Sequence, residues 1–255
     1  MDAKERSLAI IDYLNLHESA GVTELSEAFQ VSEMTIRRDL NQLEKDKIVI
    51  RVHGGAKLLS DMKEASAHDR IITQAEEKSR LGAFAVSLIE AGDTIALDDS
   101  STTLAMIPFL RVPVTVITNH IQVATALAEN ELAEVVLIGG HLRKKSLSFT
   151  GAMMEDYLKQ FQVDKAFLSA KSCGIEKGIF DASIDEAHSK KIFMECARKT
   201  YFLFDHTKIG QRSFHKVCGI NQTDGIITDV YEGNTALLEE LEQYCSNEHI
   251  DFYAV

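Results

Sequence analysis

Cysteine and proline are scarce in this sequence, and tryptophan is absent. The two prolines lie close together, around one expected helix-to-strand turn, so every longer element is free of a helix breaker. The cysteines are isolated, and none belongs to a C-x-x-C pair. This pattern indicates reduced, packed thiols rather than a metal site or a disulfide framework. The four cysteines are Cys173, Cys196, Cys218 and Cys245.

Long apolar runs and several catalytic motifs are also missing. No stretch approaches 18 consecutive apolar residues, which excludes a membrane-spanning helix. The N-terminus, Met-Asp-Ala-Lys-Glu-Arg, lacks the apolar h-region of a signal peptide, so we expect a cytoplasmic protein. The chain contains no H-E-x-x-H motif, no G-x-G-x-x-G motif and no Walker loop, so we expect neither a metal nor a cofactor.

Basic residues are outnumbered by acidic ones, 27 to 39, which by itself disfavours nucleic-acid binding. The excess of acidic residues is distributed unevenly along the chain. Residues 1–60 hold 8 basic and 10 acidic residues, a net charge of −2, whereas residues 61–255 hold 19 and 29, a net charge of −10. Residues 31–57 hold 6 basic and 4 acidic residues, a net charge of +2. DNA binding by this stretch would therefore depend on dimerisation and base contacts more than on bulk charge.

Residues 31–45 have the pattern of a recognition helix. Ile36, Leu40 and Leu43 are spaced i, i+4, i+7 and form one apolar stripe, and Ser32 is placed to cap the helix. The opposite face carries side chains of the kind that contact base edges and phosphates. These are Met34, Thr35, Arg37, Arg38, Asn41 and Gln42.

The flanking segments predict a winged helix-turn-helix. We expect a first helix over residues 4–16, a break at Ala20-Gly21, a second helix over Thr23–Phe29 and a turn at residues 30–32. The inward side chains would be Leu8, Ile11, Leu14 and Leu16 in the first helix and Leu25, Ala28 and Phe29 in the second. The run 48–52 followed by Gly54-Gly55 predicts a small hairpin. The alternative is a plain three-helix bundle whose Arg37 and Arg38 are merely solvated.

The chain length allows a small domain and a large one. We predict a DNA-binding domain over residues 1–58, a linker over 59–75 and an effector-sensing α/β domain over 76–255. The large domain would begin with a helix that turns Leu81, Ala85, Leu88 and Ile89 inward and ends at Gly92.

From Asp93 onward, short apolar runs alternate with helical patterns. We expect strands at 94–97, 114–118, 135–138, 166–170, 201–204, 225–228 and 250–255, and helices near 102–110, 121–129, 151–161, 185–199 and 234–245. This alternation predicts a Rossmann-like, mainly parallel sheet covered on both faces. Ligands of such sheets bind beyond the carboxyl ends of the strands.

Three polar loops follow these strands. The first, Asp98-Asp-Ser-Ser-Thr-Thr103, offers hydroxyls and free helix amides to a phosphate. The second is Thr118-Asn119-His120, and the third is Gly139-Gly140-His-Leu-Arg143-Lys-Lys145. Each loop alone could be a simple helix cap or a solvated charge. Three loops at equivalent strand ends favour one ligand site.

Residues 1–60 resemble the winged helix-turn-helix of the DeoR/GlpR family of bacterial sugar-metabolism repressors. The signature is Val31-Ser32-x-x-Thr35-Ile36-Arg37-Arg38-Asp39-Leu40-x-x-Leu43, followed by Arg51-x-His53-Gly54-Gly55-Ala56. The resemblance implies DNA contacts from Ser32, Met34, Thr35, Arg37, Arg38, Asn41, Gln42, Arg51 and His53.

The rest of the chain resembles the family's effector-binding domain, which is similar to ribose-5-phosphate isomerase. The sequence matches five motifs of that domain in order, namely Asp-x-Gly-Thr-Thr, Thr-Asn, Gly-Gly-x-x-Arg, Glu-Ala-x-x-Lys and Asp-x-x-Lys. This sequence departs from the family pattern at Ser101, where the family usually has glycine, and at Lys171-Ser172-Cys173, where small and acidic residues are common in the family. The resemblance implies an effector site of Asp98, Ser100, Ser101, Thr102, Thr103, Thr118, Asn119, Gly139, Gly140, Arg143, Glu186, Lys190 and Lys208.

We therefore expect a repressor of a carbohydrate or sugar-alcohol operon. It would bind double-stranded operator DNA as a homodimer or tetramer, release it on binding a phosphorylated sugar or polyol, and have no membrane association. Two alternatives stay open. One is a sugar-phosphate isomerase-like enzyme that uses carboxylates and lysines of the same loops, among them Asp99 and Asp181. The other is an activator or structural DNA-binding protein without a ligand.

Overall fold

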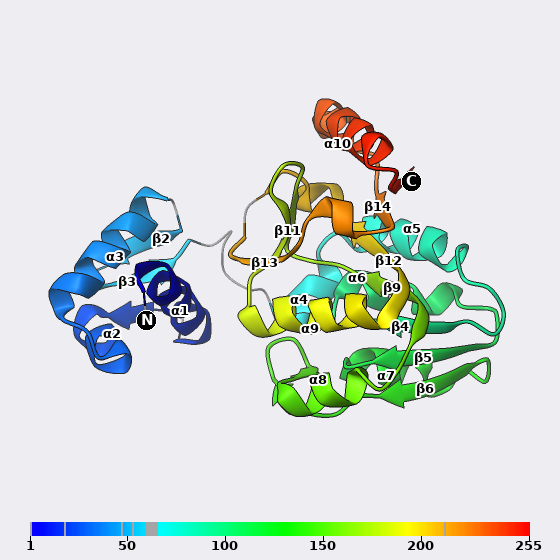
Figure 1. Ribbon diagram of the computed structural model, residues 1–255, viewed down its shortest axis with the longest axis horizontal. Coiled ribbons are helices and arrows are strands. Elements are labelled where there is room, and N and C mark those ends of the chain that lie inside the picture. Colours follow the sequence, from blue (N-terminus) through cyan, green and yellow to red (C-terminus); the bar gives the residue numbers. More distant parts are fainter. Residues whose placement is uncertain (1, 18, 47, 53, 60–65, 212) are drawn as a thin grey trace. The chain divides into compact units, whose positions relative to one another are not determined.

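The computed structural model describes residues 2–17, 19–46, 48–52, 54–59, 66–211 and 213–255. The chain forms two units, one made mainly of residues 1–64 and one made mainly of residues 65–255 (Figure 1). Each is described by itself below. Within the described residues, no helix is both long enough and apolar enough to cross a membrane.

The smaller unit has the helix and strand order of a winged helix-turn-helix. Its elements are α1 (Ala3–His17), β1 (Ser19–Gly21), α2 (Val22–Phe29), α3 (Glu33–Lys45), β2 (Val49–Val52) and β3 (Gly55–Leu58). The strands form an antiparallel sheet in the order β1-β3-β2. Gln30 adopts the left-handed conformation at the end of α2, where the sequence predicts the turn.

The apolar stripe predicted for α3 is confirmed, because Ile36, Leu40 and Leu43 are all buried. They pack in the unit that also buries Ile11 and Leu14 of α1. The prediction was wrong for Ala28, which is exposed. In the short helix α2 this residue falls at the margin of the stripe, and Val22 is buried instead. The side chain of Leu16 lies outside the described residues.

The segment predicted as a simple break, Ala20-Gly21, belongs instead to strand β1. It pairs with β3, with Ala20 opposite Ala56 and Gly21 opposite Gly55. A Cβ atom on Gly55 would lie 2.1 Å from the carbonyl oxygen of Ala20. The glycine is therefore required by the close approach of these two strands.

The larger unit alternates strands and helices. Its first half comprises α4 (Ala67–Ile72), α5 (Ala75–Val86), β4 (Thr94–Leu97), α6 (Ser101–Leu104), the 3₁₀ helix η2 (Ile107–Phe109), β5 (Val114–Thr118), α7 (Ile121–Leu127), β6 (Ala133–Leu137), β7 (His141–Arg143), β8 (Ser148–Thr150) and α8 (Ala152–Leu158). Its second half comprises β9 (Val163–Leu168), β10 (Ser172–Gly174), β11 (Gly178–Asp181), α9 (Ile184–Cys196), β12 (Ala197–Phe204), η3 (His206–Lys208), β13 (His215–Cys218), η4 (Ile220–Gln222), β14 (Gly225–Thr228), η5 (Glu232–Asn234), α10 (Thr235–Asn247) and β15 (Asp251–Ala254).

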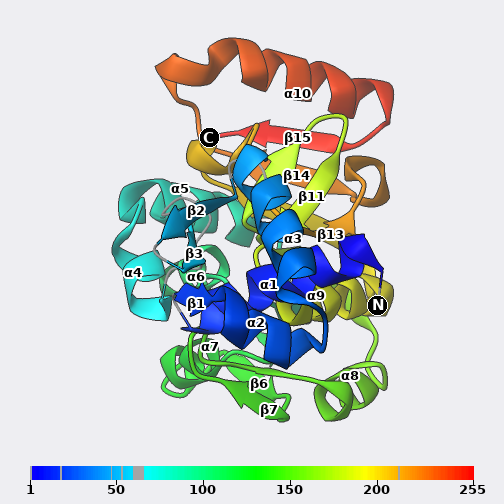
Figure 2. The same ribbon diagram turned by 90° about the vertical axis from the view of Figure 1, so that its left-hand side faces the viewer.

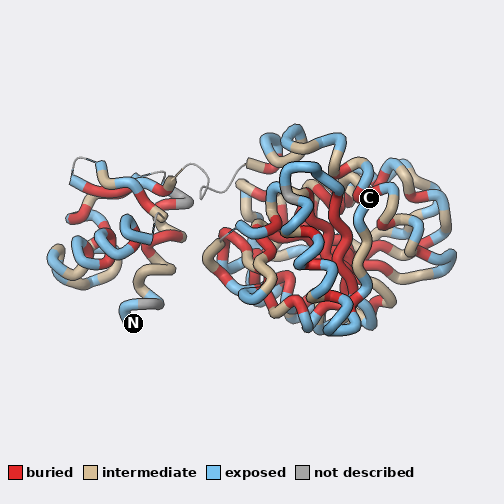
Figure 3. The backbone as a smooth tube through the Cα atoms, turned by 90° about the horizontal axis from the view of Figure 1, so that it is seen from above, coloured by how far each residue is buried: buried red, intermediate tan, exposed pale blue. Residues whose placement is uncertain are grey.

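Seven parallel strands form the central sheet, in the order β15-β14-β12-β9-β4-β5-β6. Figure 2 shows α10 lying along β15 at one edge of this sheet. Alternate residues of each strand face opposite sides, so Phe202 and Phe204 of β12 join one core while Tyr201 and Leu203 join the other. The central strands are almost wholly buried (Figure 3). The predicted doubly covered α/β sheet is confirmed.

Helices α8, α9 and α10 contribute to the core on one face of the sheet, and α5, η2 and α7 to the core on the other. The helix predicted over 102–110 is divided into α6 and η2, because Pro108 at the start of η2 lacks a backbone N–H. The first helix ends at Val86 rather than Gly92, although Ile89 is still buried.

Some elements are absent from the sequence-based prediction. An antiparallel sheet β10-β11-β13 and the hairpin β7-β8 occupy stretches that the sequence leaves as loops. Helix α4 lies inside the stretch 59–75 that the sequence suggests as a linker. The boundaries 1–58, 59–75 and 76–255 themselves stay a prediction.

A charged pair ties the recognition helix to α1. Asp39, on the buried side of α3, accepts hydrogen bonds from Arg6 at 2.6 Å (Nε) and 3.2 Å (Nη2). This pairing raises the pKa of the Arg6 guanidinium. Loss of Arg6 would leave a largely buried carboxylate without its two donors, which is more costly than loss of an exposed pair.

We expect Arg6→Met to lower the free energy of unfolding of the smaller unit by about 1.5–3 kcal/mol. The matched control is Arg37→Ala, which removes an exposed ion pair to Glu33 and should cost about 0.5 kcal/mol or less. Denaturant unfolding followed by circular dichroism measures both. Equal losses for the two variants would contradict a structural role for the Arg6–Asp39 pair.

Candidate functional site

One face of α3 is free of core contacts. A helix turns by about 100° per residue, so the side chains predicted to contact DNA lie within one arc opposite the buried stripe. They are Met34, Arg37, Arg38, Asn41 and Gln42, and all five are exposed. Met34 is 73% exposed, so its side chain is accessible.

Some of these side chains are already held in place. Arg37 donates to Glu33 at 2.9 Å, and Gln42 donates to both carboxylate oxygens of Asp46 at 3.2 and 3.1 Å. Within the described part of the chain, Arg38 has no such partner. It is therefore the arginine of this face that can reach DNA without breaking an existing contact.

Ser32 and Thr35 set the start of the helix. The Ser32 hydroxyl accepts from the backbone N–H of Thr35 at 3.2 Å, as the sequence predicts for an N-cap. Their hydroxyl oxygens are 2.9 Å apart. Both hydroxyls thus have a structural role, and contact with DNA by either stays a prediction.

The hairpin is linked to the recognition helix by Arg51 of β2. Its Nη1 donates to the side-chain oxygen of Asn41 at 2.9 Å, and its Nε donates to the carbonyl of Gly55 at 3.2 Å. Arg51 therefore places the amide of Asn41 as well as its own charge near the recognition face. His53, predicted as a DNA contact, lies outside the described residues.

In the larger unit, the predicted loops meet at the carboxyl edge of the sheet. Asp98 and Asp99 follow β4, Thr118 ends β5, and Asp205 to Lys208 follow β12. Because these strands are parallel and neighbouring, their ends share one edge. The structure brings these loops together with β8 and α9.

Lys190 of α9 is the centre of this cluster. Its buried ammonium lies 3.5 Å from Asp98, 3.1 Å from Asp99 and 3.1 Å from Asp181. These carboxylates hold the pKa of Lys190 well above its usual value, against the opposing effect of burial. Asp181 comes from β11 and is absent from the predicted site. Lys190 thus joins three elements, and a role in effector binding stays a prediction.

Asp98, Ser100 and Thr103 hold the first loop in shape. One carboxylate oxygen of Asp98 accepts from the backbone N–H of Ser100 at 3.1 Å and from the Thr103 hydroxyl at 3.0 Å. The other accepts from the backbone N–H of Ser169 at 2.9 Å. Ser100 caps α6 by accepting from the backbone N–H of Thr103 at 3.0 Å. These predicted site residues therefore shape the loop.

Lys208 has the arrangement expected of an anion-binding lysine. Its ammonium donates to the hydroxyls of Ser169 at 2.9 Å and Thr102 at 3.4 Å, and lies 3.6 Å from Asp205. Burial lowers the pKa of Lys208 despite Asp205. The side chain keeps 19% exposure, whereas that of Lys190 keeps 3%. Ser101, next to Thr102, is half-buried.

Arg143 and Glu186 form a second charged contact at the site. Arg143, at the end of β7, donates to Glu186 at 2.8 Å and to the Ser146 hydroxyl at 3.2 Å. Arg70 of α4 approaches the same carboxylate, at 4.0 Å. Sequence patterns give no signal for Arg70, because α4 lies in a stretch with little periodicity.

The remaining predicted residues have mixed roles. Thr118 accepts from the backbone N–H of His120 at 3.1 Å, and Asn119 donates its amide to the carbonyl of Phe149 at 2.9 Å. A Cβ atom on Gly140 would lie 2.8 Å from the carbonyl of Thr150, so this glycine serves the packing of its own hairpin. Gly139 is exposed, and a Cβ atom there would meet nothing within 4 Å.

Helix α4 is tied to the site by several contacts. The backbone N–H of Ala67 donates to the carbonyl of Lys145 at 2.9 Å. Lys78 of α5 donates to the carbonyls of Arg70 and of Thr73, the latter at 2.6 Å. Burial, together with the charge of Lys208, lowers the pKa of Lys78 to about 8. Gln74 lies 3.5 Å from His206, in the loop that carries Lys208.

A further cluster at this edge is missed by the sequence patterns. Asp229, buried at the end of β14, accepts from the backbone N–H and pairs with Nδ1 of His206, both at 2.6 Å. The His206 ring stacks on Tyr231 with centroids 4.3 Å apart, and Arg80 lies 3.8 Å from Asp229. These contacts fix η3, the segment that positions Lys208.

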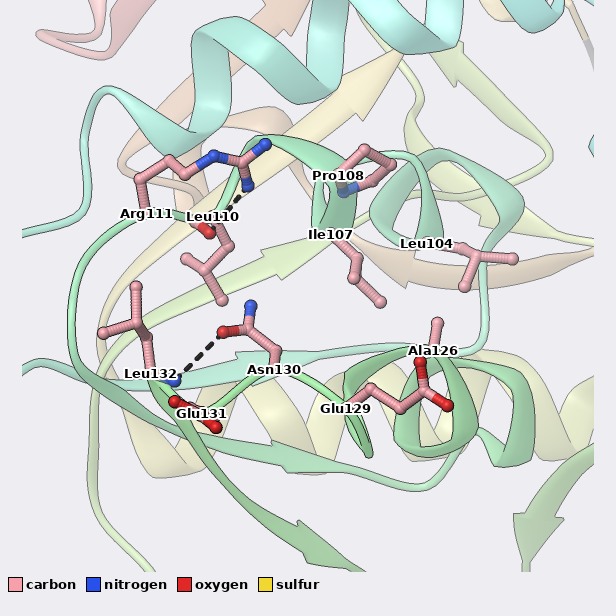
Figure 4. Close-up of a pocket in the computed structure, with 10 residues that line it drawn as sticks. All are labelled: Leu104, Ile107, Pro108, Leu110, Arg111, Ala126, Glu129, Asn130, Glu131 and Leu132. Atoms are coloured by element: carbon pink, nitrogen blue, oxygen red, sulfur yellow. Dashed lines mark hydrogen bonds between the residues drawn. The ribbon is translucent and has the colours of Figure 1, made fainter.

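A hollow of about 760 Å³ lies elsewhere, at the amino ends of β5 and β6. Figure 4 shows Leu104, Ile107 and Leu110 on one side of it and Ala126 and Glu129 on the other. It lies at the opposite edge of the sheet from Lys208 and contains none of the predicted site residues.

Two family models match the chain. The DeoR-like helix-turn-helix domain matches residues 6–62, and the DeoR C-terminal sensor domain matches residues 73–230. The chain is 36% identical to the HTH-type transcriptional repressor GlcR of Bacillus subtilis over 231 residues, covering 90% of this chain and 89% of GlcR. It is 30% identical to the glycerol-3-phosphate regulon repressor of Escherichia coli K12 over 231 residues, covering 90% and 92%.

Among solved structures, ribose 5-phosphate isomerase A of Methanocaldococcus jannaschii aligns with a TM-score of 0.41 and 19% identity, over 54% of this chain and 55% of that one. A winged helix-turn-helix with an exposed recognition face, followed by a parallel α/β domain, defines the class of DNA-binding regulators with a separate sensor domain. The chain belongs to the DeoR family of transcriptional repressors of sugar metabolism.

Replacing Lys190 or Lys208 in the sensor domain should change stability by very different amounts. Lys190→Met leaves three buried carboxylates without their counter-charge, and we expect it to lower the free energy of unfolding by about 3–5 kcal/mol. Lys208→Met removes an ammonium whose pKa is lowered because burial disfavours its charged form. We therefore expect it to change the free energy of unfolding by about 1 kcal/mol or less. Thermal unfolding of the full chain distinguishes them. Similar losses would contradict a purely structural role for Lys190.

Proposed function

We propose that this repressor is controlled by a phosphorylated sugar or polyol bound at the carboxyl edge of the sheet. The observation that carries the proposal is the arrangement of Lys208, Thr102 and Ser169, which presents a partly exposed ammonium beside two hydroxyls. An ammonium beside the Thr102 hydroxyl is suited to a phosphate group, whereas the Ser169 hydroxyl already donates to the carbonyl of Leu203. The name of the glycerol-3-phosphate regulon repressor supports a phosphorylated effector.

The other charged groups of the site favour binding over turnover. Isomerisation of a sugar phosphate needs a carboxylate that is free to remove a proton from carbon. Asp98 and Asp99 are engaged by Lys190 and by hydroxyl or amide donors, and Glu186 is engaged by Arg143. We therefore propose a sensor and not an enzyme, acting in the cytoplasm.

Helix α4 offers a route from the effector to DNA binding. It is the first described element of the larger unit, so it is the sensor element nearest in sequence to the DNA-binding unit. Arg70 of α4 approaches Glu186, and Gln74 approaches the loop of Lys208. A ligand that contacts Lys208 and Arg143 would alter both contacts. A ligand shifts the equilibrium only if its affinity differs between the two arrangements of α4.

A homodimer or tetramer would present two recognition helices to successive major grooves. The weak positive charge of residues 31–57 supports this, because one such unit alone would bind DNA weakly.

The first test measures binding of the full chain to the DNA upstream of its own gene, with a panel of sugar and polyol phosphates and their unphosphorylated parents. We expect one phosphate, but not its parent, to change operator affinity about fivefold to 150-fold. Specific DNA binding that no phosphate alters would refute the effector proposal. Turnover of a sugar phosphate by the pure protein would instead support the enzyme.

In the same assay, Arg70→Ala should separate ligand binding from its effect on DNA. We expect the variant to bind the active phosphate but to change operator affinity less than the parent chain does, because α4 loses its contact with Glu186. Lys208→Met is the comparison, since it should lose ligand binding itself. An Arg70→Ala protein with a full response would exclude this route.

Arg38→Ala should weaken operator binding by about 1–3 kcal/mol if the guanidinium contacts a base, or reduce the salt dependence by about one ion if it contacts phosphate. The matched control is Arg198→Ala, because Arg198 is an arginine of the sensor domain whose side chain is 75% exposed. Fluorescence anisotropy at several salt concentrations measures both. Unchanged operator affinity for Arg38→Ala would remove it from the interface.

A further inference from the structure

Buried polar atoms without partners gather at the junction of β5 and α7. His120 is 1% exposed, yet neither of its ring nitrogens has a hydrogen-bond partner among the described residues. The side-chain oxygens of Asn119 and Gln122 also lack a partner in hydrogen-bond geometry, although the Gln122 side chain lies close enough to His120 to raise its pKa. Four of the seven such side-chain atoms in the described part of the chain thus belong to three residues within one four-residue stretch. Native proteins rarely leave such atoms unsatisfied, so a cluster of them calls for an explanation.

The segment that carries these atoms is held in place. The backbone N–H of His120 donates to the Thr118 hydroxyl at 3.1 Å, and the backbone carbonyl of Asn119 accepts from Phe149 at 2.8 Å. The amide nitrogen of Asn119 donates to the carbonyl of Phe149 at 2.9 Å. That bond fixes which end of the amide is which, and leaves its oxygen as an unused acceptor.

The surroundings keep the imidazole neutral. Burial, which is the largest effect, and the charge of Arg70 lower the pKa of His120, whereas Asp99, Asp98 and a contact with the Gln122 side chain raise it. A neutral imidazole has one donor and one acceptor nitrogen. The Gln122 oxygen lies beside the imidazole and can accept from its donor nitrogen, so the other ring nitrogen and the Asn119 oxygen remain as two acceptors. They match hydroxyl groups, each of which donates one hydrogen bond.

We propose that His120 and Asn119 bind hydroxyl groups of the effector, so that the effector is a polyhydroxylated compound with a single phosphate. This inference rests on the proposed function, because it assigns the other end of the same ligand. The phosphate would lie toward Lys208, and the hydroxyl-bearing chain toward β5. A second anionic group at this end is disfavoured, because it would meet unpaired acceptors and the nearby Asp99.

Binding here requires movement of a neighbouring group, because His120 is almost fully enclosed. Arg70 lies close enough to lower the pKa of His120, and it belongs to α4. A ligand hydroxyl that reaches His120 would thus disturb the same helix through which we propose that the effector acts.

The test uses the full chain and isothermal titration calorimetry. The probes are inorganic phosphate, glycerol 3-phosphate, glucitol 6-phosphate, fructose 1-phosphate and fructose 1,6-bisphosphate. The variants are His120→Ala and His120→Asn, since asparagine restores one donor and one acceptor. His188→Ala is the matched control, because the His188 side chain is 56% exposed.

We expect His120→Ala to weaken binding of the best hydroxylated monophosphate by roughly tenfold to a hundredfold, and His120→Asn to recover part of it. Binding of inorganic phosphate should change less than about twofold, since its contacts lie near Lys208. A merely structural role for His120 would lower the melting temperature and weaken both kinds of ligand alike.

Undiminished binding of the hydroxylated monophosphate to His120→Ala would overturn this inference and leave the proposed function intact. Tighter binding of the bisphosphate than of any monophosphate would overturn the argument from unpaired acceptors. If the parent chain binds none of the organic phosphates, the proposed function fails, and this inference fails with it.

Discussion

The buried ammonium of Lys190 is the constraint on which the sensor site depends. It is surrounded by Asp98, Asp99 and Asp181, which come from different elements, so one side chain of α9 holds the β4 loop and β11 together. Charges this deeply buried are stable only when each has a close partner. These carboxylates therefore have a structural role. We propose that the ligand binds at the periphery of the cluster, where Lys208 is partly exposed among hydroxyls.

In the DNA-binding unit, too, charged side chains are paired within the protein. The recognition face has two arginines, but Arg37 is held by Glu33 and only Arg38 is without a partner among the described residues of that face. Salt-dependent attraction to DNA scales with the number of phosphates that Lys and Arg side chains neutralise, so a single unit has a weak electrostatic footprint. DNA affinity would therefore depend on oligomerisation and on contacts made by Asn41, which Arg51 of the hairpin orients.

Helix α4 is the element through which we propose that the effector acts on DNA binding. It is short, it contacts the sensor site through Arg70, and its carboxyl end is fixed by Lys78, whose ammonium donates to two of its carbonyls. A site whose charges are already balanced can respond to a ligand by exchanging partners rather than by gaining charge. The exchange we propose is the replacement of an internal arginine contact by contacts with the effector.

Local periodicity in the sequence determined the elements whose pattern repeats over several residues. The stripe of α3, its Ser32 cap and the buried strands β4, β5 and β14 follow from spacing and apolar runs alone. The meeting of the polar loops at one edge follows from the geometry of parallel strands. Only the tertiary structure decided which of those loop residues are engaged within the protein, that Lys190 is enclosed by Asp181, and that Arg70 approaches Glu186. It also formed the β10-β11-β13 sheet, whose strands of three or four residues are too short to show a period. The physical reason is distance along the chain. Ion pairs such as Lys190–Asp99 join residues 91 positions apart, and nothing in the local spacing of either residue encodes its partner.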